Sequence, residues 1–254
     1  MTSALVASLL EARREPRVVV PPSETQRLSL EEAYAVQDQV REALVAEGER
    51  VAGWKAAFTN AAMQNNYGTT GPVCGFLLAS GVLTSGAEIP TSRFCAPIVE
   101  AEIAFVMRTD LAGPGVTPPR ALLAVEGAMP ALELPDFRMS GKPLGTDVVA
   151  DGIFAKGIVL GGALTSVSHL DLALEGLVYE MNGAVVATNT AAEVLGNPLN
   201  SLVWVANHLG SRGLGLRAGD VVMTGSVSQL LRPKAGDTVR ASFTRLGSVS
   251  VRFA

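Results

Sequence analysis

The sequence predicts an α+β fold, with a small helical N-terminal domain over residues 1–85 and a β-rich domain over residues 86–254. Two observations lead to this division. Apolar residues recur at helical spacing in the first part, whereas short valine-bearing runs bounded by turn residues fill the second. The chain of 254 residues is long enough for one large and one small domain, and its apolar content of 48% provides a sizeable core.

Two helices are expected in the N-terminal part. The first covers residues 1–14, which lack the basic start of a signal peptide and carry acidic and basic residues directly after their apolar stretch. The second begins at Ser29, which forms a capping box with Glu32, and Gly48 ends it. We therefore expect an N-terminus that folds rather than one that directs export.

Turn residues mark the strands that we expect after residue 85. Asn182-Gly183 separates the apolar runs 177–181 and 184–187, and it favours a type I′ hairpin turn because both residues accept positive φ. Ala218-Gly219-Asp220 and Ala235-Gly236-Asp237 each precede a valine-bearing strand. The C-terminal part is thus predicted to be rich in strands.

Two further helices interrupt these strands. One is predicted from Pro119 to a stop at Gly127, and the other has Asn197 as its cap and Pro198 at its first position. The glycines of 157–162 bracket a strand, and no Lys or Ser/Thr partner follows them as in a phosphate-binding loop. A nucleotide-dependent enzyme is therefore not expected.

Composition excludes several classes of protein. A net charge of −4 without a Lys/Arg block argues against a nucleic-acid or anionic-membrane partner, and no apolar run reaches spanning length. Cys74 and Cys95 are too few for a disulfide framework, so we expect a cytoplasmic protein with reduced thiols. His169 and His208 are interpreted as structural, the latter because its positive charge would favour a helix C-terminus.

Glu100 and Glu102 are the most unusual feature of the predicted strands, because they are the only charges in the apolar run 97–107. Alternate residues of a strand share a face at a separation of about 6.6 Å. Burying two like charges requires a shared proton, a basic partner or a bound cation, and we favour the cation. The alternative is a half-exposed edge strand whose glutamates face water.

Glu133 is the best candidate for a third carboxylate, since it is the lone acid of the short apolar run 128–134. The helix predicted before it allows a return strand beside the first one. An all-oxygen set favours Mg²⁺ or Mn²⁺ over zinc, which prefers histidine and cysteine. A purely structural carboxylate cluster is the alternative, and Asp136, next to a proline, is interpreted as a turn residue.

Lys55 is the only Asp, Glu, Lys or Arg residue between Arg50 and Glu88. If it is buried, it faces an anionic substrate or a proton-transfer step with a pKa depressed by desolvation. The alternative is an ordinary solvated lysine. The uncharged polar segment 65–72 is predicted to be a loop, either a lid or a simple connection.

Six segments carry a likeness to a known family: 53–55, 97–105, 131–138, 147–151, 195–200 and 219–226. As a set, they resemble the 2-keto-4-pentenoate hydratase and 4-oxalocrotonate decarboxylase group of the fumarylacetoacetate hydrolase superfamily, from about residue 30 to the C-terminus. The resemblance implies a mixed β-roll and β-sandwich core of the fumarylacetoacetate hydrolase C-terminal type. We also expect a small-molecule oxo-acid substrate and a homo-oligomer.

The resemblance implies that Glu100, Glu102 and Glu133 hold Mg²⁺ or Mn²⁺, and it places the lysine of the family motif at Lys55. Such an ion would chelate the carboxylate and 2-oxo oxygen of an unsaturated oxo acid. Segments near the substrate carboxylate and at the pocket edge imply the following substrate-binding residues: Thr59, Asp151, Thr224, Gly225 and Ser226. Arg138 is a further candidate, for binding a distal acid.

The sequence departs from the family pattern at three places, one of which is the usual Lys-Ile-Gly-Leu-Thr-Ser, here Lys55-Ala56-Ala57-Phe58-Thr59-Asn60. The acid of a Pro-Asp-Phe-Gly segment typical of hydratases is here Val73, as in the decarboxylases, and the usual Ala-Asp-Asn ends in Gly152. We predict a metal-dependent lyase for small 2-oxo or 2-hydroxydienoate acids in aromatic catabolism, with hydration ahead of decarboxylation. A C–C hydrolase and a non-catalytic oxo-acid binder are the alternatives.

Overall fold

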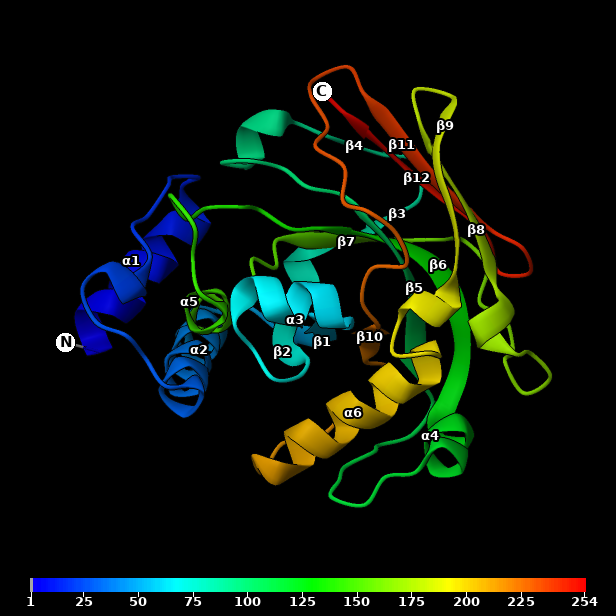
Figure 1. Ribbon diagram of the computed structural model, residues 1–254, viewed down its shortest axis with the longest axis horizontal. Coiled ribbons are helices and arrows are strands. Elements are labelled where there is room, and N and C mark those ends of the chain that lie inside the picture. Colours follow the sequence, from blue (N-terminus) through cyan, green and yellow to red (C-terminus); the bar gives the residue numbers. More distant parts are fainter. Residues whose placement is uncertain (1) are drawn as a thin grey trace.

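The computed structural model describes residues 2–254, with side chains from residue 4 onward, and contains two β-sheets flanked by helices (Figure 1). Helices α1 and α2 lie on one side of the molecule, and the C-terminal strands lie on the other. The α-helices are α1 (Thr2–Arg14), α2 (Leu30–Ala46), α3 (Ala61–Tyr67), α4 (Pro118–Ala124), α5 (Gly145–Ala150) and α6 (Pro198–Ser211). None of the helices in the described part of the chain has the length and apolarity needed to cross a membrane.

The larger sheet has seven strands in the order β2-β1-β10-β5-β6-β7-β3. Its strands are β1 (Val51–Ala57), β2 (Val73–Leu78), β3 (Val82–Thr84), β5 (Glu100–Met107), β6 (Val125–Leu134), β7 (Gly157–Leu160) and β10 (Val221–Met223). The smaller sheet has the order β4-β12-β11-β8-β9. Its strands are β4 (Ala87–Ile89), β8 (Gly176–Met181), β9 (Ala184–Thr190), β11 (Thr238–Phe243) and β12 (Gly247–Phe253).

The predicted domain boundary at residue 85 does not separate two sheets. Strand β1 pairs in parallel with β10 and antiparallel with β2, and β3 pairs with β7. Residues 1–85 therefore contribute three strands to the sheet that also contains β5 and β6, in addition to the predicted helices. The division at 85 is a change of composition, whereas backbone pairing crosses it.

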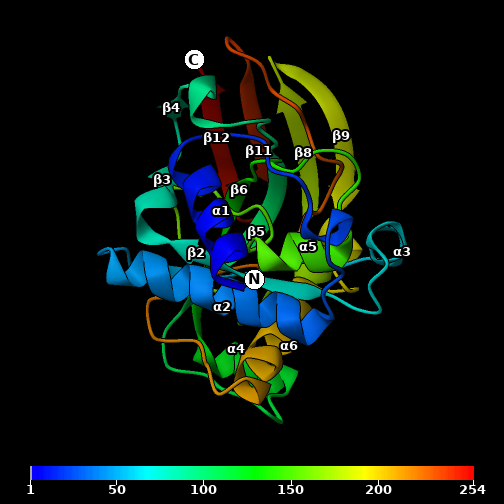
Figure 2. The same ribbon diagram turned by 90° about the vertical axis from the view of Figure 1, so that its left-hand side faces the viewer.

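The predicted helices are largely confirmed. The capping box of Ser29 and Glu32 opens α2, and the side chain of Asn197 accepts from the N–H of Leu199 at the start of α6. Helix α1 agrees with the prediction, apart from residue 1, which lies outside the described residues. Figure 2 looks directly onto α1 and α2, which pack against each other.

Two predictions about helices were wrong. Helix α4 ends at Ala124, and Gly127 lies within β6, where a Cβ would be 2.7 Å from the carbonyl oxygen of Thr165. Gly127 thus permits a close backbone approach instead of ending a helix. The expected loop 65–72 begins inside α3, which is capped by Asn60 and ends at Gly68 with a φ of +68°.

The predicted hairpin and turns are confirmed. Asn182 and Gly183 connect β8 to β9 with φ values of +54° and +77°, as a type I′ turn requires. The two Ala-Gly-Asp turns precede β10 and β11. His208 is structural, as expected, but its ring stacks on Trp204, and burial lowers its pKa to about 4, so it is neutral near pH 7 and the expected favourable charge is absent.

The position of β5 decides between the two interpretations of its glutamates. It lies inside the sheet between β10 and β6, so the edge-strand alternative is wrong. Ala101, Ile103 and Phe105 on its opposite face are fully buried in the main core. The carboxylates of β5 are therefore held in the interior by a strand that is buried on both faces.

Candidate active site

The three predicted carboxylates converge on neighbouring strands. Glu100 of β5 lies directly opposite Glu133 of β6. Glu102 lies two residues further along β5, on the same face of the sheet. Paired residues of antiparallel strands project to the same side of the sheet. One carboxylate oxygen from each glutamate lies within 4.8 Å of the others, and the side chains of Glu102 and Glu133 are 1% exposed. The predicted set is thus assembled by the register of β5 and β6.

The electrostatics of these carboxylates favour a cation. Burial, and then the neighbouring Glu133, raises the pKa of Glu100 to about 7. Burial and both neighbouring carboxylates raise the pKa of Glu102 well above its ordinary value, although the N–H of Gly225 donates to it at 2.8 Å. The Oε2 atom of Glu133 is buried without a hydrogen-bond partner. Three crowded carboxylates with one unsatisfied oxygen fit a hard divalent ion.

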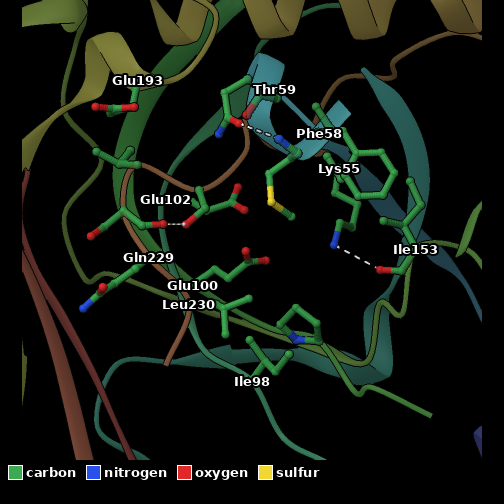
Figure 3. Close-up of a pocket in the computed structure, with 18 of the residues that line it drawn as sticks. Lys55, Phe58, Thr59, Ile98, Glu100, Glu102, Ile153, Glu193, Gln229 and Leu230 are labelled. Carbon is green, nitrogen blue, oxygen red and sulfur yellow. Dashed lines mark hydrogen bonds between the residues drawn. The ribbon is translucent and has the colours of Figure 1, made fainter. Parts of the chain in front are cut away.

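The side chain of Lys55, on β1, extends to the same cluster of glutamates. Its side chain is 2% exposed, so the interpretation as a solvated surface lysine is wrong. The ammonium forms a buried ion pair with Glu133 and donates to the backbone carbonyl of Ile153 at 3.2 Å. Figure 3 shows Lys55 and Ile153 on one side of a cavity, with Glu100 and Glu102 across from them.

The carbonyl that binds Lys55 belongs to a turn with unusual backbone angles. Gly152, Ile153 and Phe154 follow one another with φ values of +76°, +58° and +55°. A β-branched residue such as isoleucine rarely adopts this region, and strained residues of this kind cost about 1–3 kcal/mol each. The turn is held by a hydrogen bond of 2.9 Å from the N–H of Asp136 to the carbonyl of Phe154. The surrounding structure therefore imposes the geometry that orients the lysine.

Glu100, Glu102 and Lys55 border a cavity of about 450 Å³, and Glu133 is paired with Lys55 outside the lining. Its other walls are mainly apolar, and Phe58 stacks on Tyr67 with ring centroids 4.5 Å apart. Apolar and aromatic lining residues include Met63, Ile98, Phe137, Phe154 and Leu230. Lys55 is the one cationic residue among the lining residues of the described chain, whereas Glu193 lies at an exposed part of the wall. The cavity is suited to a small acid bound by its polar end.

The structure places the five predicted substrate-binding residues differently. Thr59 and Ser226 line the cavity. Gly225 supports Glu102 through its N–H and packs so closely that a Cβ would lie 2.5 Å from the Oγ1 of Thr59. Thr224 is fully buried and donates its hydroxyl to the carbonyl of Ile103 at 2.8 Å. Gly225 and Thr224 thus support residues of the cavity wall without lining the cavity themselves.

Asp151 and Arg138 lie outside the cavity lining and bind each other. Both side chains are completely buried, with the Nε of Arg138 2.9 Å from Asp151. The expectation that Arg138 binds a distal acid is wrong, because Asp151 and Asp136 already surround its guanidinium. Asp136 also accepts from the N–H groups of Cys95 and Ala96 and forms an isolated β-bridge with Pro97, so its interpretation as a turn residue is wrong.

Some features of the site were not predicted. Helix α3 supplies Met63 and Tyr67 to the wall, and the left-handed turn supplies the carbonyl for Lys55. Asn60, a favourable N-cap residue, was a signal that could have revealed α3. Val73, which replaces the acid typical of hydratases, is buried at the start of β2 and lies outside the cavity lining.

Comparison with known proteins gives a consistent result. A profile of the fumarylacetoacetate (FAA) hydrolase C-terminal family matches residues 42–254. The chain is 34% identical over 233 residues to the 2-oxo-hept-4-ene-1,7-dioate hydratase of Escherichia coli, covering 89% of this chain and 87% of the relative. It is 35% identical over 248 residues to the TodF product hydratase of Pseudomonas putida, covering 97% and 92%.

A solved structure resembles the whole chain. The 4-oxalocrotonate decarboxylase from Pseudomonas putida G7, complexed with magnesium and adipate, superposes with a TM-score of 0.95 at 31% identity. The match covers 100% of this chain and 97% of that one. The fold class inferred from the six sequence segments is thereby confirmed.

Proposed function

Because this chain belongs to the fumarylacetoacetate hydrolase family, we propose that it is a divalent-metal-dependent lyase for small unsaturated 2-oxo and 2-hydroxydienoate acids. The specific reaction is that of a 2-keto-4-pentenoate hydratase in the catabolism of aromatic compounds. Water adds to 2-hydroxypenta-2,4-dienoate and yields 4-hydroxy-2-oxopentanoate. The cluster of Glu100, Glu102 and Glu133, with Lys55 paired to it at the edge of one cavity, is the observation that carries this proposal.

Glu100, Glu102 and Glu133 would hold the ion, Mg²⁺ or Mn²⁺. Their oxygen atoms are the ligand type that these ions prefer, and the unpartnered Oε2 of Glu133 fits a ligand that is not provided by the protein itself. When bound, a divalent ion supplies Lewis-acid polarisation of a carboxylate and its adjacent 2-oxo oxygen. The glutamates therefore define the end of the cavity where the polar part of the substrate binds.

Lys55 would hold or transfer a proton at its Nζ atom. Hydration of a dienol requires protons to be delivered to the carbon chain and removed from oxygen, and a positioned side chain typically accelerates such transfers by about 10²–10⁴-fold. The Nζ of Lys55 is fixed by Glu133 and by the carbonyl of Ile153 beside the cavity. This arrangement supports a proton-transfer role because the donor is oriented before substrate binds.

Other wall residues would bind and enclose the substrate. The hydroxyl group of Thr59 is suited to a carboxylate in the cavity, whereas that of Ser226 donates to the carbonyl of Ser228 at 2.7 Å and would have to rotate to do the same. The stacked rings of Phe58 and Tyr67 provide an apolar surface for the unsaturated chain. Gly225 would contribute indirectly by holding Glu102.

Decarboxylation of a 4-oxalocrotonate-type acid is the second candidate function. Two observations favour it. The structural match with a TM-score of 0.95 is to a 4-oxalocrotonate decarboxylase, and Val73 provides no acid to position water. The metal site and Lys55 would be used in the same way, with carbon dioxide leaving in place of water adding.

Product analysis by NMR separates these reactions. Purified protein with Mg²⁺ is incubated with dienoates that carry or lack a terminal carboxylate. We expect a new hydroxyl-bearing carbon from 2-hydroxypenta-2,4-dienoate, whereas release of CO₂ from the terminally carboxylated substrate would identify the decarboxylase. Acid and ketone fragments would instead indicate a C–C hydrolase, and binding without turnover would indicate an oxo-acid binder. Either of the last two results contradicts the proposal.

We also propose that the protein is a cytoplasmic homo-oligomer whose partners are small molecules, with no nucleic-acid or membrane partner. The net charge of −4 without a basic block supports the exclusion of nucleic acid and anionic membranes. Light scattering after size-exclusion chromatography tests the assembly, and the mass of a single chain would contradict it.

A further inference from the structure

A second cavity, of about 570 Å³, shares no lining residue with the candidate active site and includes Arg13 and Arg14 from the C-terminal end of α1. Its apolar part includes Phe76 of β2 and Ile158 of β7. The cationic residues that line it come from three separate parts of the chain: Arg13, Arg14, Arg93 and Lys156. Nothing in the proposed reaction uses this cavity.

The acids that line the cavity do not balance these cations. Glu47 and Glu49 are the carboxylate residues of the lining. Glu47 forms an ion pair with Arg14, and Glu49 accepts a hydrogen bond of 2.7 Å from the hydroxyl of Ser80. Within the described side chains, Arg93 and Lys156 form no ion pair with a carboxylate. Positive charge therefore remains in excess around the cavity.

The deepest cations are partly removed from water. The ammonium of Lys156 donates to the carbonyl of Arg13 at 2.9 Å, a neutral partner. Burial lowers the pKa of Lys156, and Arg138, Arg13 and Arg93 lower it further, whereas Asp136 opposes this effect. Burial and Arg138 likewise lower the pKa of Arg13 to about 10, although Asp151 and Asp136 oppose this effect. Like charges crowded in this way are stabilised by an anion.

Arg13 also has an unsatisfied donor. Its Nη atoms donate to the carbonyl oxygens of Asp151 and Ala155, whereas its Nε is buried without a hydrogen-bond partner. A Cβ at Gly152 would lie 2.5 Å from the Nη2 of Arg13, so glycine at this position makes room for the guanidinium. The backbone beside the cavity thus leaves space for the guanidinium of Arg13.

We infer that this cavity binds a small dianion with oxygen ligands, either a phosphate group or a dicarboxylate, between Lys156, Arg93 and Arg13. Guanidinium and ammonium groups are the residues that bind such oxygens through charge-assisted hydrogen bonds. The bound anion would stabilise the turn that begins at Asp151, because Arg13 donates to the carbonyl of that residue.

Calorimetric titration with inorganic phosphate tests this inference in the full-length, Mg²⁺-loaded protein. We expect one phosphate site per chain in addition to any anion bound at the metal, and we expect it to be weakened by about tenfold or more in Lys156→Gln and in Arg93→Gln, because each removes a charged hydrogen-bond partner. Lys156→Arg keeps the charge and should retain binding. Lys142→Gln and Arg120→Gln, at exposed cations outside the cavity, are the matched controls and should bind as the parent does.

A parallel titration with succinate distinguishes the two kinds of anion, and tighter binding of one identifies the source. No phosphate or succinate binding, or equal affinity in the parent and both Gln variants, would overturn the inference. So would a change of oligomer mass in these variants with unchanged anion affinity, since the cavity would then be covered by a second copy of the chain. These measurements do not depend on turnover, so they fail or succeed independently of the proposed function.

Discussion

Lys55 and Ile153 are joined by a hydrogen bond of 3.2 Å from the lysine ammonium to the isoleucine carbonyl, and Ile153 has a φ of +58°. The same ammonium pairs with Glu133. The lysine is therefore oriented by a metal-binding candidate on one side and by a strained turn on the other. Strain of this kind persists only where the surrounding structure imposes it, and it is concentrated at functional sites.

Replacing Lys55 should slow catalysis strongly. In Lys55→Met we expect kcat to fall by about 10²–10⁴-fold, the usual contribution of a positioned proton donor, with a smaller change in KM. Steady-state kinetics on 2-hydroxypenta-2,4-dienoate measures this. Lys142→Met, at an exposed lysine, is the control. A loss of less than tenfold in Lys55→Met would show that the lysine has no part in the chemistry.

Replacing Glu102 should weaken metal binding. We expect the Kd for Mg²⁺ to rise by more than about 100-fold in Glu102→Gln, since changes to groups that only support a ligand already cost about 10–100-fold. Calorimetric titration provides the measurement. Glu193→Gln changes a cavity glutamate outside the cluster and should bind Mg²⁺ normally. Equal affinity in both variants would rule out the proposed site.

The pair of Asp151 and Arg138 should be a major source of stability. Asp151→Asn leaves the fully buried guanidinium with only Asp136 nearby, and breaking a buried pair typically costs about 3–5 kcal/mol. Urea unfolding should show a free energy of unfolding lower by this amount. Glu180→Gln breaks an exposed pair with Arg240 and should change it by less than about 1 kcal/mol. Similar small effects in both variants would contradict the structural role.

His208 should make stability depend on pH. Burial lowers its pKa to about 4 in the folded protein, below the ordinary 6.5, so the unfolded chain binds the proton more readily between these values. The contribution of neutral His208 is complete above about pH 6.5 and is lost as the pH falls toward 4. Because the side chain is partly exposed and water screens its charge, we expect the loss of unfolding free energy to be about 1–2 kcal/mol, less than the full pKa difference would give.

The comparison with His208→Gln isolates this effect from the other titrating groups. The difference in unfolding free energy between the parent and the variant, measured by urea at pH 7 and pH 5, should shrink at the lower pH. A difference that stays constant, or grows, would show that the folded protein does not disfavour the charged imidazole.

Two of the three metal-binding candidates were predictable because the pattern that reveals them lies within one strand. Alternation places Glu100 and Glu102 on one face, and their isolation among apolar residues makes the burial of charge visible in the sequence. Glu133 was predicted as a third member from the same isolation. The register of β5 and β6 then brings Glu133 opposite Glu100 and completes the set.

Other parts of the site depend on contacts between distant segments, which no local pattern reports. The pairing of β1 with β10 joins residues near 54 to residues near 222, and composition gives no sign of this pairing across residue 85. The carbonyl of Ile153 becomes a partner of Lys55 only through a turn held by Asp136. The prediction that Arg138 binds a distal acid failed because its two acidic partners become its neighbours only after folding.

Removal and restoration of metal tests the central claim most directly. The protein is stripped with a chelator, the chelator is removed, and consumption of 2-hydroxypenta-2,4-dienoate is followed before and after addition of Mg²⁺ or Mn²⁺. The site formed by Glu100, Glu102 and Glu133 predicts that activity is lost on stripping and recovered with either ion. Full activity in the metal-free protein would contradict it.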